Sequence, residues 1–479
     1  MIYKKYEKCT LYHGLMQDEL GNLADNSVDS IVTDPPYELN FMNKAWDNSG
    51  VAFQADTWRH CLRVLKPGGY LLAFGGSRTF HRIACAIEDA GFEIRDTILW
   101  LYGSAMPKSL NIGNAVESKL QTGSANTKDW RNLEGKKVES GDWGLWKNAN
   151  EYGYRPRDYG EDEHERLVKP DYKTEEGKRW DGWGSMLKPS FEPVIVARKP
   201  CDGTLTDNVL KWGVGGLNID ECRIGTDLVG GGTTPDFRDV GKKSKEAAGI
   251  DKLSFGQVKN AERVEYPEHR GRFPANVILT YDDTDFDEVC GGLPSGGQNG
   301  SITKRYDMNN QVYGDYGKCN LWQAYNDSGS AARYFYCAKA STRDRDEGCE
   351  LLAKKKATSK INKSNGTGER FDGEQTPIRA NTHSCVKPVA LMQYLIRLVT
   401  PRGGTILDPF MGSGSTGKAA MYENRDRNAD YKFIGIEMTA EYLPIAAARI
   451  EFAMNDKRVV ETEHPTPEQS TDSQVKFDL

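Results

Sequence analysis

Residues 28–37 read VDSIVTDPPY, a short apolar run that stops at a carboxylate, two prolines and an aromatic ring. The β-branched residues of the run favour a strand buried in a sheet. Asp34, Pro35, Pro36 and Tyr37 then form a rigid polar cup with a flat lid at the carboxyl end of the strand. Such a cup would hold a planar ring that bears an exocyclic amine. The same residues are also compatible with a turn that ends a strand, with Asp as turn former and Tyr as packing.

The segments around this stretch alternate between strand and helix patterns. The pattern predicts strands at 10–13, 28–33, 70–74 and 94–102, and helices at 57–65 and 79–90. Lys66-Pro67-Gly68-Gly69 is expected to end the first of these helices, because Pro and Gly commonly follow a basic helix C-terminus. Strands that alternate with helices indicate parallel βαβ units, so the sequence predicts a doubly wound α/β sheet.

The same alternation returns near the C-terminal end of the chain. The pattern predicts helices at 388–398, from about 415, and at 442–453, with strands at 404–407 and 433–436. Residues 113–184 and 201–375 are polar and glycine-rich, and are interrupted by a predicted strand at 191–197 and by apolar islands at 273–280 and 331–338. These two stretches are interpreted as a polar insertion and a larger inserted region, and the tail from 456 is expected to be disordered.

The loop Gly412-Ser413-Gly414-Ser415-Thr416-Gly417-Lys418-Ala419 fits three patterns. As G-x-x-x-x-G-K it imitates a phosphate-binding P-loop, but Ala419 stands where a magnesium-binding hydroxyl is needed. As G-x-G-x-x-G with Glu437 twenty residues beyond, it imitates a dinucleotide site. As Asp-Pro-Phe-x-Gly-x-Gly from Asp408, it matches the strand end of methyltransferases that bind S-adenosylmethionine, in which Glu437 would take the ribose diol.

Composition sets wider limits on the class of protein. The chain has 479 residues, 38% of them hydrophobic, and a formal net charge of -6, which neither indicates nor excludes a nucleic-acid partner. It contains no apolar run long enough for a membrane span, and its first residues lack the apolar stretch of a secretory signal. Ten cysteines and seven histidines are dispersed without a Cys-x-x-Cys pair. We therefore expect free thiols in a cytoplasmic protein, with no zinc site.

Taken together, these motifs give the chain a resemblance to a known family. The chain resembles DNA amino-methyltransferases of the β arrangement, in which the catalytic tetrapeptide precedes the cofactor loop, and in particular the phage and prophage site-specific enzymes. The matching stretches are 33–37, 66–101, 187–200, 331–340 and 381–449. Within the last, Thr382-His383-Ser384-Cys385-Val386-Lys387-Pro388 resembles the family's His-Pro-Thr-x-Lys-Pro segment, which helps to shape the cofactor pocket.

The resemblance implies a circularly permuted, Rossmann-like methyltransferase fold with a mostly parallel seven-stranded sheet and a large inserted target-recognition region. The implied divisions are a target-base half at 1–112, a polar insertion at 113–184, a catalytic-domain strand at 185–200, a target-recognition region at 201–375, a cofactor half at 376–455 and a disordered tail at 456–479. The implied catalytic residues are Asp34, Pro35, Pro36 and Tyr37. The implied S-adenosylmethionine-binding residues are Asp408, Phe410, Met411, Gly412, Ser413, Gly414, Glu437 and Lys387, and no metal is implied.

The implied reaction is methyl transfer to the exocyclic amine of a base extruded from double-stranded DNA. Asp34 and the Pro35 carbonyl would accept hydrogen bonds from the amine, and Tyr37 would stack on the base. Within the family Asp at the first position more often accompanies adenine N6, which is the favoured target, while cytosine N4 and an oxidoreductase with a nicotinamide dinucleotide stay open. The expected setting is the cytoplasm of a bacterial or phage-infected cell, as part of restriction and modification, with the protein a monomer or homodimer without membrane contact.

Overall fold

The computed structural model describes residues 1–39, 45–102, 109–125, 137–138, 166–167, 172–235, 263–280, 336–337, 342–356, 378–383 and 385–458. The chain divides into two compact units, one formed by 1–217 with 338–460 and the other by 218–337 with 461–479. The first unit therefore joins the two ends of the chain that carry the predicted motifs. The predicted tail beyond residue 458 lies outside the described residues. So do residues 126–136, 139–165 and 168–171 of the predicted polar insertion, and residues 236–262, 281–335, 338–341 and 357–375 of the predicted target-recognition region.

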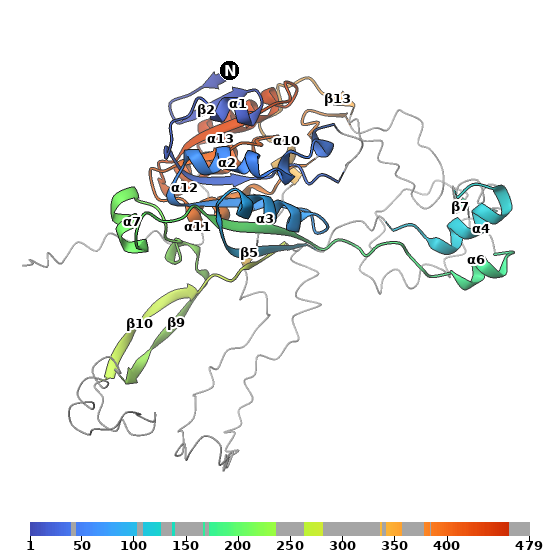
Figure 1. Ribbon diagram of the computed structural model, residues 1–479, viewed down its shortest axis with the longest axis horizontal. Coiled ribbons are helices and arrows are strands. Elements are labelled where there is room, and N and C mark those ends of the chain that lie inside the picture. The colour runs from blue at the N-terminus through green and yellow to red at the C-terminus, as the bar shows by residue number, and fades with distance from the viewer. Residues whose placement is uncertain are drawn as a thin grey trace, which may run out of the picture. The chain divides into compact units, whose positions relative to one another are not determined.

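A sheet runs through the first unit, and its strands far apart in sequence lie side by side (Figure 1). Its strands are β1 (Ile2–Lys5), β2 (Cys9–His13), β3 (Val28–Thr33), β4 (Leu65–Phe74), β5 (Glu93–Tyr102), β8 (Phe191–Arg198), β15 (Thr405–Asp408) and β16 (Lys432–Glu437). Their order is β1-β2-β16-β15-β3-β4-β8-β5. From β2 to β4 neighbouring strands pair in parallel, whereas β8 is antiparallel to both β4 and β5, and β1 adds an antiparallel edge.

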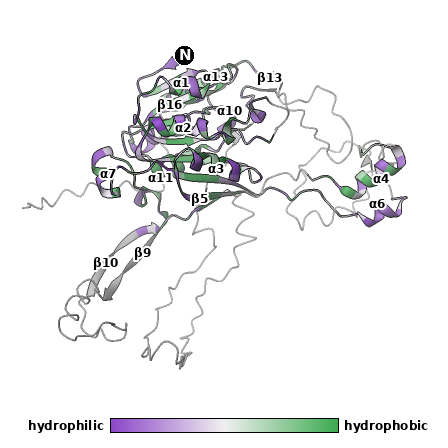
Figure 2. Cartoon of the chain, in the orientation of Figure 1, coloured by the Kyte–Doolittle hydropathy of each residue, from purple (hydrophilic) through white to green (hydrophobic). Residues whose placement is uncertain are grey.

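Helices cover the two faces of this sheet in separate layers (Figure 1). They are α1 (Met16–Leu20), α2 (Ala55–Val64), α3 (Phe80–Asp89), α11 (Val389–Val399), α12 (Ser415–Arg427) and α13 (Leu443–Asn455), with short 3₁₀ turns η2 (Ala45–Asn48) and η3 (Val51–Phe53). One core cluster joins Trp58 of α2 and Ile83 of α3 to Leu71 and Ile195 of the sheet. Neighbouring residues on these strands, such as Leu72 and Val194, are equally buried, as expected for a sheet that is covered on both faces. Figure 2 shows the resulting pattern, with hydrophobic residues along the central strands and hydrophilic residues outward on α2 and α3.

The predicted start of β4 was wrong. The sequence was expected to end a helix at 66–69 and to begin a strand at Tyr70, but α2 stops at Val64 and β4 begins at Leu65. The pairing with β3 shifts register here, and Gly68 adopts φ +76° within an irregular stretch of the strand. Its N–H donates to Lys199 O at 3.0 Å, so backbone pairing with the end of β8 keeps these residues in the sheet.

Helices also form within the predicted polar insertion and within the larger predicted region at 201–375. They are α4 (Ile112–Thr122), α6 (Glu175–Arg179), α7 (Leu205–Trp212) and α10 (Thr342–Asp346), beside the small ladders β6 (Lys137–Val138) with β7 (Arg166–Leu167) and β13 (Lys355–Lys356) with β14 (Ile378–Arg379). The side chain of Asn111 caps α4 and Gly123 ends it at φ +76°. The sequence carries both cap signals, an asparagine before the helix and a glycine after it.

The second unit contains η6 (Asp220–Cys222), β9 (Ile224–Pro235), β10 (Arg263–Arg272), β11 (Val277–Thr280) and β12 (Tyr336–Cys337). β9 and β10 form an antiparallel pair, and β11 pairs in parallel with β12. The last two coincide with the apolar islands of the sequence. In the described part of the chain, no helix has both the length and the apolar content that a membrane crossing requires.

Candidate active site

The carboxylate of Asp34 stands at the carboxyl end of β3, where the sequence placed it. Its Oδ2 lies 2.6 Å from Lys387 Nζ. Its Oδ1 is buried and has no hydrogen-bond partner among the described residues. Because a buried carboxylate oxygen without a donor is costly, this atom is a strong acceptor for an N–H group that enters the cavity.

Lys387, just before α11, places an ammonium between two carboxylates. Besides Asp34, its Nζ lies 3.3 Å from Glu192 of β8 and donates to the Tyr37 hydroxyl at 3.1 Å. The ammonium also lies 4.9 Å from the ring centroid of Phe74, and its side chain is 8% exposed. Burial favours the neutral amine, but Asp34 and Glu192 outweigh it and raise the pKa of Lys387, so the ammonium stays charged. The sequence placed Lys387 with the cofactor residues, whereas in the structure it contacts the tetrapeptide.

Glu192 was not among the predicted site residues. Its Oε2 accepts a hydrogen bond from the Tyr37 hydroxyl at 2.9 Å, and its Oε1 accepts one from Tyr102 at 3.4 Å. Burial, together with the charges of Asp34 and Glu192, raises the pKa of Tyr37, so its hydroxyl remains a donor. A signal for Glu192 existed in the sequence, since it is a charged residue at the start of an otherwise apolar strand.

Asp408 ends β15, the strand next to β3. Its carboxylate accepts hydrogen bonds from the hydroxyls of Thr33 at 2.7 Å and Thr416 at 2.6 Å, and from the Phe410 backbone N–H at 3.1 Å. These bonds connect the end of β3 with the first turn of α12. Asp408 thus joins the two predicted halves of the site, although most of its bonding capacity is directed to the protein itself.

The loop before α12 needs its glycines. Gly412 and Gly414 have φ values of +54° and +76°, in the left-handed region that favours glycine. A Cβ on Gly414 would lie 2.9 Å from Ala446 Cα, and one on Gly412 would lie 2.9 Å from His383 Nε2. The loop is therefore pressed against α13 and the segment before α11, which leaves the N-terminus of α12 beside the cavity.

Glu437 ends β16, as predicted, and holds this loop. Its Oε2 accepts the Gly412 N–H at 2.8 Å, and its Oε1 accepts the Thr439 N–H at 2.7 Å. Burial raises the pKa of Glu437, while these two backbone bonds oppose the shift. Each oxygen keeps further acceptor capacity.

These residues share a cavity of about 1190 Å³ in the first unit. Its lining includes every predicted site residue except Gly414: Asp34, Pro35, Pro36, Tyr37, Lys387, Asp408, Phe410, Met411, Gly412, Ser413 and Glu437. Further lining residues are Glu192, Tyr102, Arg345, His383, Thr416 and Thr439. One cavity thus brings together the ends of β3, β15 and β16, as expected for a parallel sheet with a crevice at its carboxyl edge.

Lys418 excludes the P-loop interpretation of the glycine loop. Its side chain is fully buried, and its Nζ pairs with Glu347 at 2.9 Å instead of facing the cavity. It is not a lining residue of the cavity. A P-loop lysine must reach a bound phosphate, which this one cannot do.

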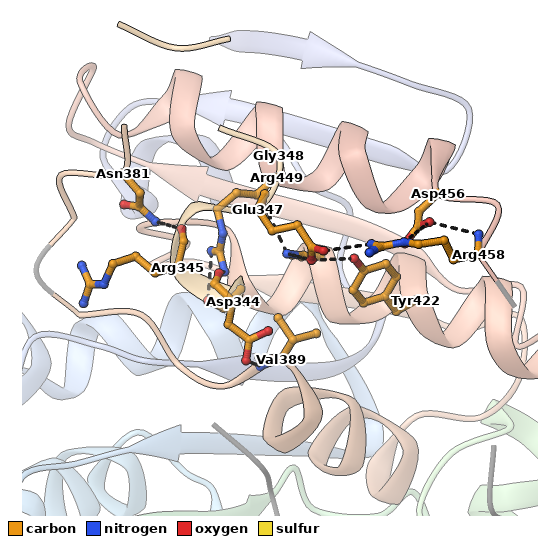
Figure 3. A network of polar contacts seen from close by, with 12 residues as sticks. Asp344, Arg345, Glu347, Gly348, Asn381, Val389, Tyr422, Arg449, Asp456 and Arg458 are labelled. Carbon is orange, nitrogen blue, oxygen red and sulfur yellow. Dashed lines mark hydrogen bonds and ion pairs between the residues drawn. The ribbon is translucent and has the colours of Figure 1, made fainter. Parts of the chain in front are cut away.

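Arg449 of α13 holds the loop before α12 and contacts Asp344 of α10 (Figure 3). Its guanidinium is fully buried and donates to Ser413 O at 2.6 Å, to the hydroxyls of Ser413 and Ser415, and to Asp344 O at 2.6 Å. Asp344 belongs to α10, and its carboxylate accepts the Val389 N–H at the start of α11 at 3.3 Å. The short helix α10 thus connects the loop before α12 with α11, the helix that follows Lys387.

Asp408 gives a pH-dependent prediction for stability. Burial raises its pKa from 3.8 to about 6, so the folded protein binds this proton more tightly than the unfolded chain. Its stabilising contribution is therefore complete below about pH 4 and is lost as pH rises through 6, by about 3 kcal/mol. We expect the free energy of unfolding of the native protein, relative to Asp408→Asn, to fall by about 2 kcal/mol between pH 4.5 and 7.5 in urea titrations. A difference independent of pH would contradict the assignment.

Within the described residues, no group of three or more His, Cys, Asp or Glu side chains could hold a metal ion. Free thiols are found at Cys9, Cys61, Cys85, Cys201, Cys222, Cys349 and Cys385.

Comparison with known proteins identifies relatives. The family model N6_N4_Mtase, described as DNA methylase, matches residues 28–448. The type II methyltransferase M.BglI of Bacillus subtilis is 42% identical over 69 residues, which are 14% of this chain and 18% of the relative. M2.DpnII of Streptococcus pneumoniae is 43% identical over 72 residues, 15% of this chain and 25% of the relative. M.HpaI of Haemophilus parainfluenzae is 34% identical over 96 residues, 19% and 31% of the two chains. The matched segments thus span less than a third of these relatives.

Two solved structures align with most of the chain at low similarity. The complex of M1.HpyAVI with S-adenosylmethionine has a TM-score of 0.31 and 14% identity, and covers 92% of this chain and 99% of that one. The cytosine-N4-specific PvuII DNA methyltransferase has a TM-score of 0.37 and 13% identity, and covers 96% and 92% of the two chains.

Proposed function

The chain belongs to the N6/N4 DNA methylase family, and from this premise we propose that it methylates the exocyclic N6 amine of adenine in double-stranded DNA. The proposal rests on one observation above all, the buried and unpartnered Oδ1 of Asp34 among the described residues. This acceptor lies at a strand end beside the Tyr37 ring, where an amine on a planar base fits. Asp at this position favours adenine over cytosine by family resemblance.

S-adenosylmethionine is the cofactor, and the residues of the cavity fit it. Gly412 lines the cavity without a side chain, so the backbone there can approach a ligand closely. The carboxylates of Asp34, Glu192 and Glu437 line the cavity and suit a cationic sulfonium. We propose that Asp408, Phe410, Met411, Gly412, Ser413, Gly414 and Glu437 form the cofactor side.

The bound cofactor supplies an electrophilic methyl group on a sulfonium. The residues of this chain would activate the amine, whose lone pair is otherwise delocalised into the ring. Asp34 Oδ1 would accept an amine N–H and favour the pyramidal nitrogen that attacks. It would also stabilise the positive charge that moves from sulfur to nitrogen as the new N–C bond forms and the C–S bond breaks, and the excess proton would then pass from the nitrogen to solvent water.

Pro35, Pro36 and Tyr37 would complete the target side. The two prolines keep the chain after β3 rigid, because each fixes its own φ. We propose that the ring of Tyr37 stacks on the base after it leaves the duplex, a contact of about 1–3 kcal/mol per base. Because the Tyr37 hydroxyl is held by Glu192 and Lys387, the ring would be oriented before the base arrives.

The test is expression in a host that lacks DNA methylation, followed by mass spectrometry of the nucleosides and sequencing that detects modified bases. The expected product is N6-methyladenine at one short recognition sequence. Detection of N4-methylcytosine instead would move the target to cytosine, with the same site chemistry. Native protein that transfers no methyl group to DNA would contradict the proposal.

A further inference from the structure

Two carboxylates and one ammonium form a compact group in the cavity, which we call the Lys387 cluster: Asp34, Tyr37, Glu192 and Lys387. The ammonium lies 2.6 Å from Asp34 and 3.3 Å from Glu192. Asp34 and Lys387 by themselves would be a neutral pair. Glu192 therefore gives the cluster its one unbalanced negative charge.

We propose that Glu192 is a positioning residue whose charge leaves this cluster with a net negative charge for the transferred methyl cation, an inference that rests on the proposed function. A neutral Asp34–Lys387 pair would stabilise a developing positive charge only weakly, because the ammonium repels it as the carboxylate attracts it. With Glu192 present, the ammonium is shared between two carboxylates. Asp34 then acts on the target nitrogen as an anion.

Glu192 also directs its two neighbours. Lys387 can donate to Glu192 and to the Tyr37 hydroxyl as well as to Asp34 Oδ2, so its N–H groups are satisfied while Asp34 Oδ1 stays without a partner among the described residues. The Tyr37 hydroxyl donates to Glu192 at 2.9 Å, which fixes the position of the hydroxyl end of the ring. Without Glu192, Asp34 would be the one carboxylate of the cluster left to pair with the Lys387 ammonium.

Glu192→Gln isolates charge from shape, since an amide oxygen can still accept from Tyr37. We expect kcat to fall about 10- to 100-fold, with KM for DNA changed by less than about threefold and thermal unfolding unaltered. Glu93→Gln is the matched control, because Glu93 pairs with Arg198 at 2.7 Å at the opposite end of β8. It should leave kcat within about twofold of native.

The double variant Glu192→Gln with Lys387→Met gives a result that a purely structural role would not. Removing both partners returns the cluster to one unbalanced carboxylate, so we expect kcat at least about fivefold above that of Glu192→Gln alone. A double variant no better than the single one would overturn the proposal. So would a Glu192→Gln enzyme with kcat within about twofold of native.

Calorimetry provides a readout that is independent of turnover. The preference for cationic S-adenosylmethionine over neutral S-adenosylhomocysteine should fall at least about threefold in Glu192→Gln and stay constant in Glu93→Gln. An unchanged preference in Glu192→Gln would contradict the proposal. Glu192→Asp, which keeps the charge on a shorter side chain, should retain both the preference and kcat within about fivefold, and loss of both would also contradict it.

Failure of the proposed function would look different. If the native protein methylates cytosine, the adenine assignment is lost while the same kinetic comparison is made on the cytosine site. If it transfers no methyl group to DNA, the calorimetric preference alone decides the role of Glu192.

Discussion

Replacing Asp34 with alanine is expected to lower methyl transfer at least about 10³-fold while affinity for neutral S-adenosylhomocysteine stays within about threefold of native. The reason is that Oδ1 of Asp34 is the buried acceptor available to a target amine among the described residues of the cavity. Other groups hold the loop before α12, chiefly Glu437 at Gly412 and Arg449 at Ser413. Two measurements test this: transfer of a tritiated methyl group to DNA, and equilibrium binding of S-adenosylhomocysteine.

Asp34→Asn is the control for shape. It preserves the volume of the side chain and one acceptor oxygen but removes the charge that pairs with Lys387. We expect it to be nearly as impaired as the alanine variant, because the charge rather than the contact stabilises the transition state. Near-native transfer by either variant would remove Asp34 from the mechanism.

The positions of the key side chains at strand ends were predictable from local sequence. A run such as VDSIVT that stops at Asp-Pro-Pro can only be a strand end, and the same holds for the run before Asp408. Parallel strands share a carboxyl edge, and Asp34, Asp408 and Glu437 each lie at the end of one, which explains why they line one cavity. The predicted boundary between helix and strand near Leu65 was wrong, because a glycine with left-handed backbone inside a strand, such as Gly68, looks in sequence like the residue that ends a helix.

The contacts inside the site were not predictable in this way. Lys387 and Glu192 lie 195 positions apart in the chain, and no local pattern indicates that their side chains meet over Tyr37. Their meeting depends on β8, which enters the sheet antiparallel between β4 and β5. Sequence periodicity shows that a segment is a strand but not which neighbours it takes. The contacts of Arg449 were equally unpredictable, since its partners come from the loop before α12 and from α10.

Glu437→Ala should produce the second large effect, a loss of cofactor affinity of about 10- to 100-fold, as expected when hydrogen bonds to a charged group are removed. Both carboxylate oxygens already accept backbone N–H groups, from Gly412 and Thr439. Glu437 therefore stabilises the conformation of the loop, independently of any contact with the ligand. Calorimetry with S-adenosylhomocysteine measures the loss, and Glu93→Gln, on a strand outside this loop, should show none.

An analogue of S-adenosylhomocysteine that lacks the ribose 2′-hydroxyl separates bracing from direct contact. If Glu437 takes the ribose diol, the analogue binds the native protein weakly but loses little more in Glu437→Ala, because the same contact is removed twice. If Glu437 acts only through Gly412 and Thr439, the two losses add. The two carboxylate oxygens retain lone pairs beyond their backbone bonds, so we expect the non-additive result. An unchanged dissociation constant in Glu437→Ala would exclude both roles, since either one makes the loop conformation or the ligand contact depend on this carboxylate.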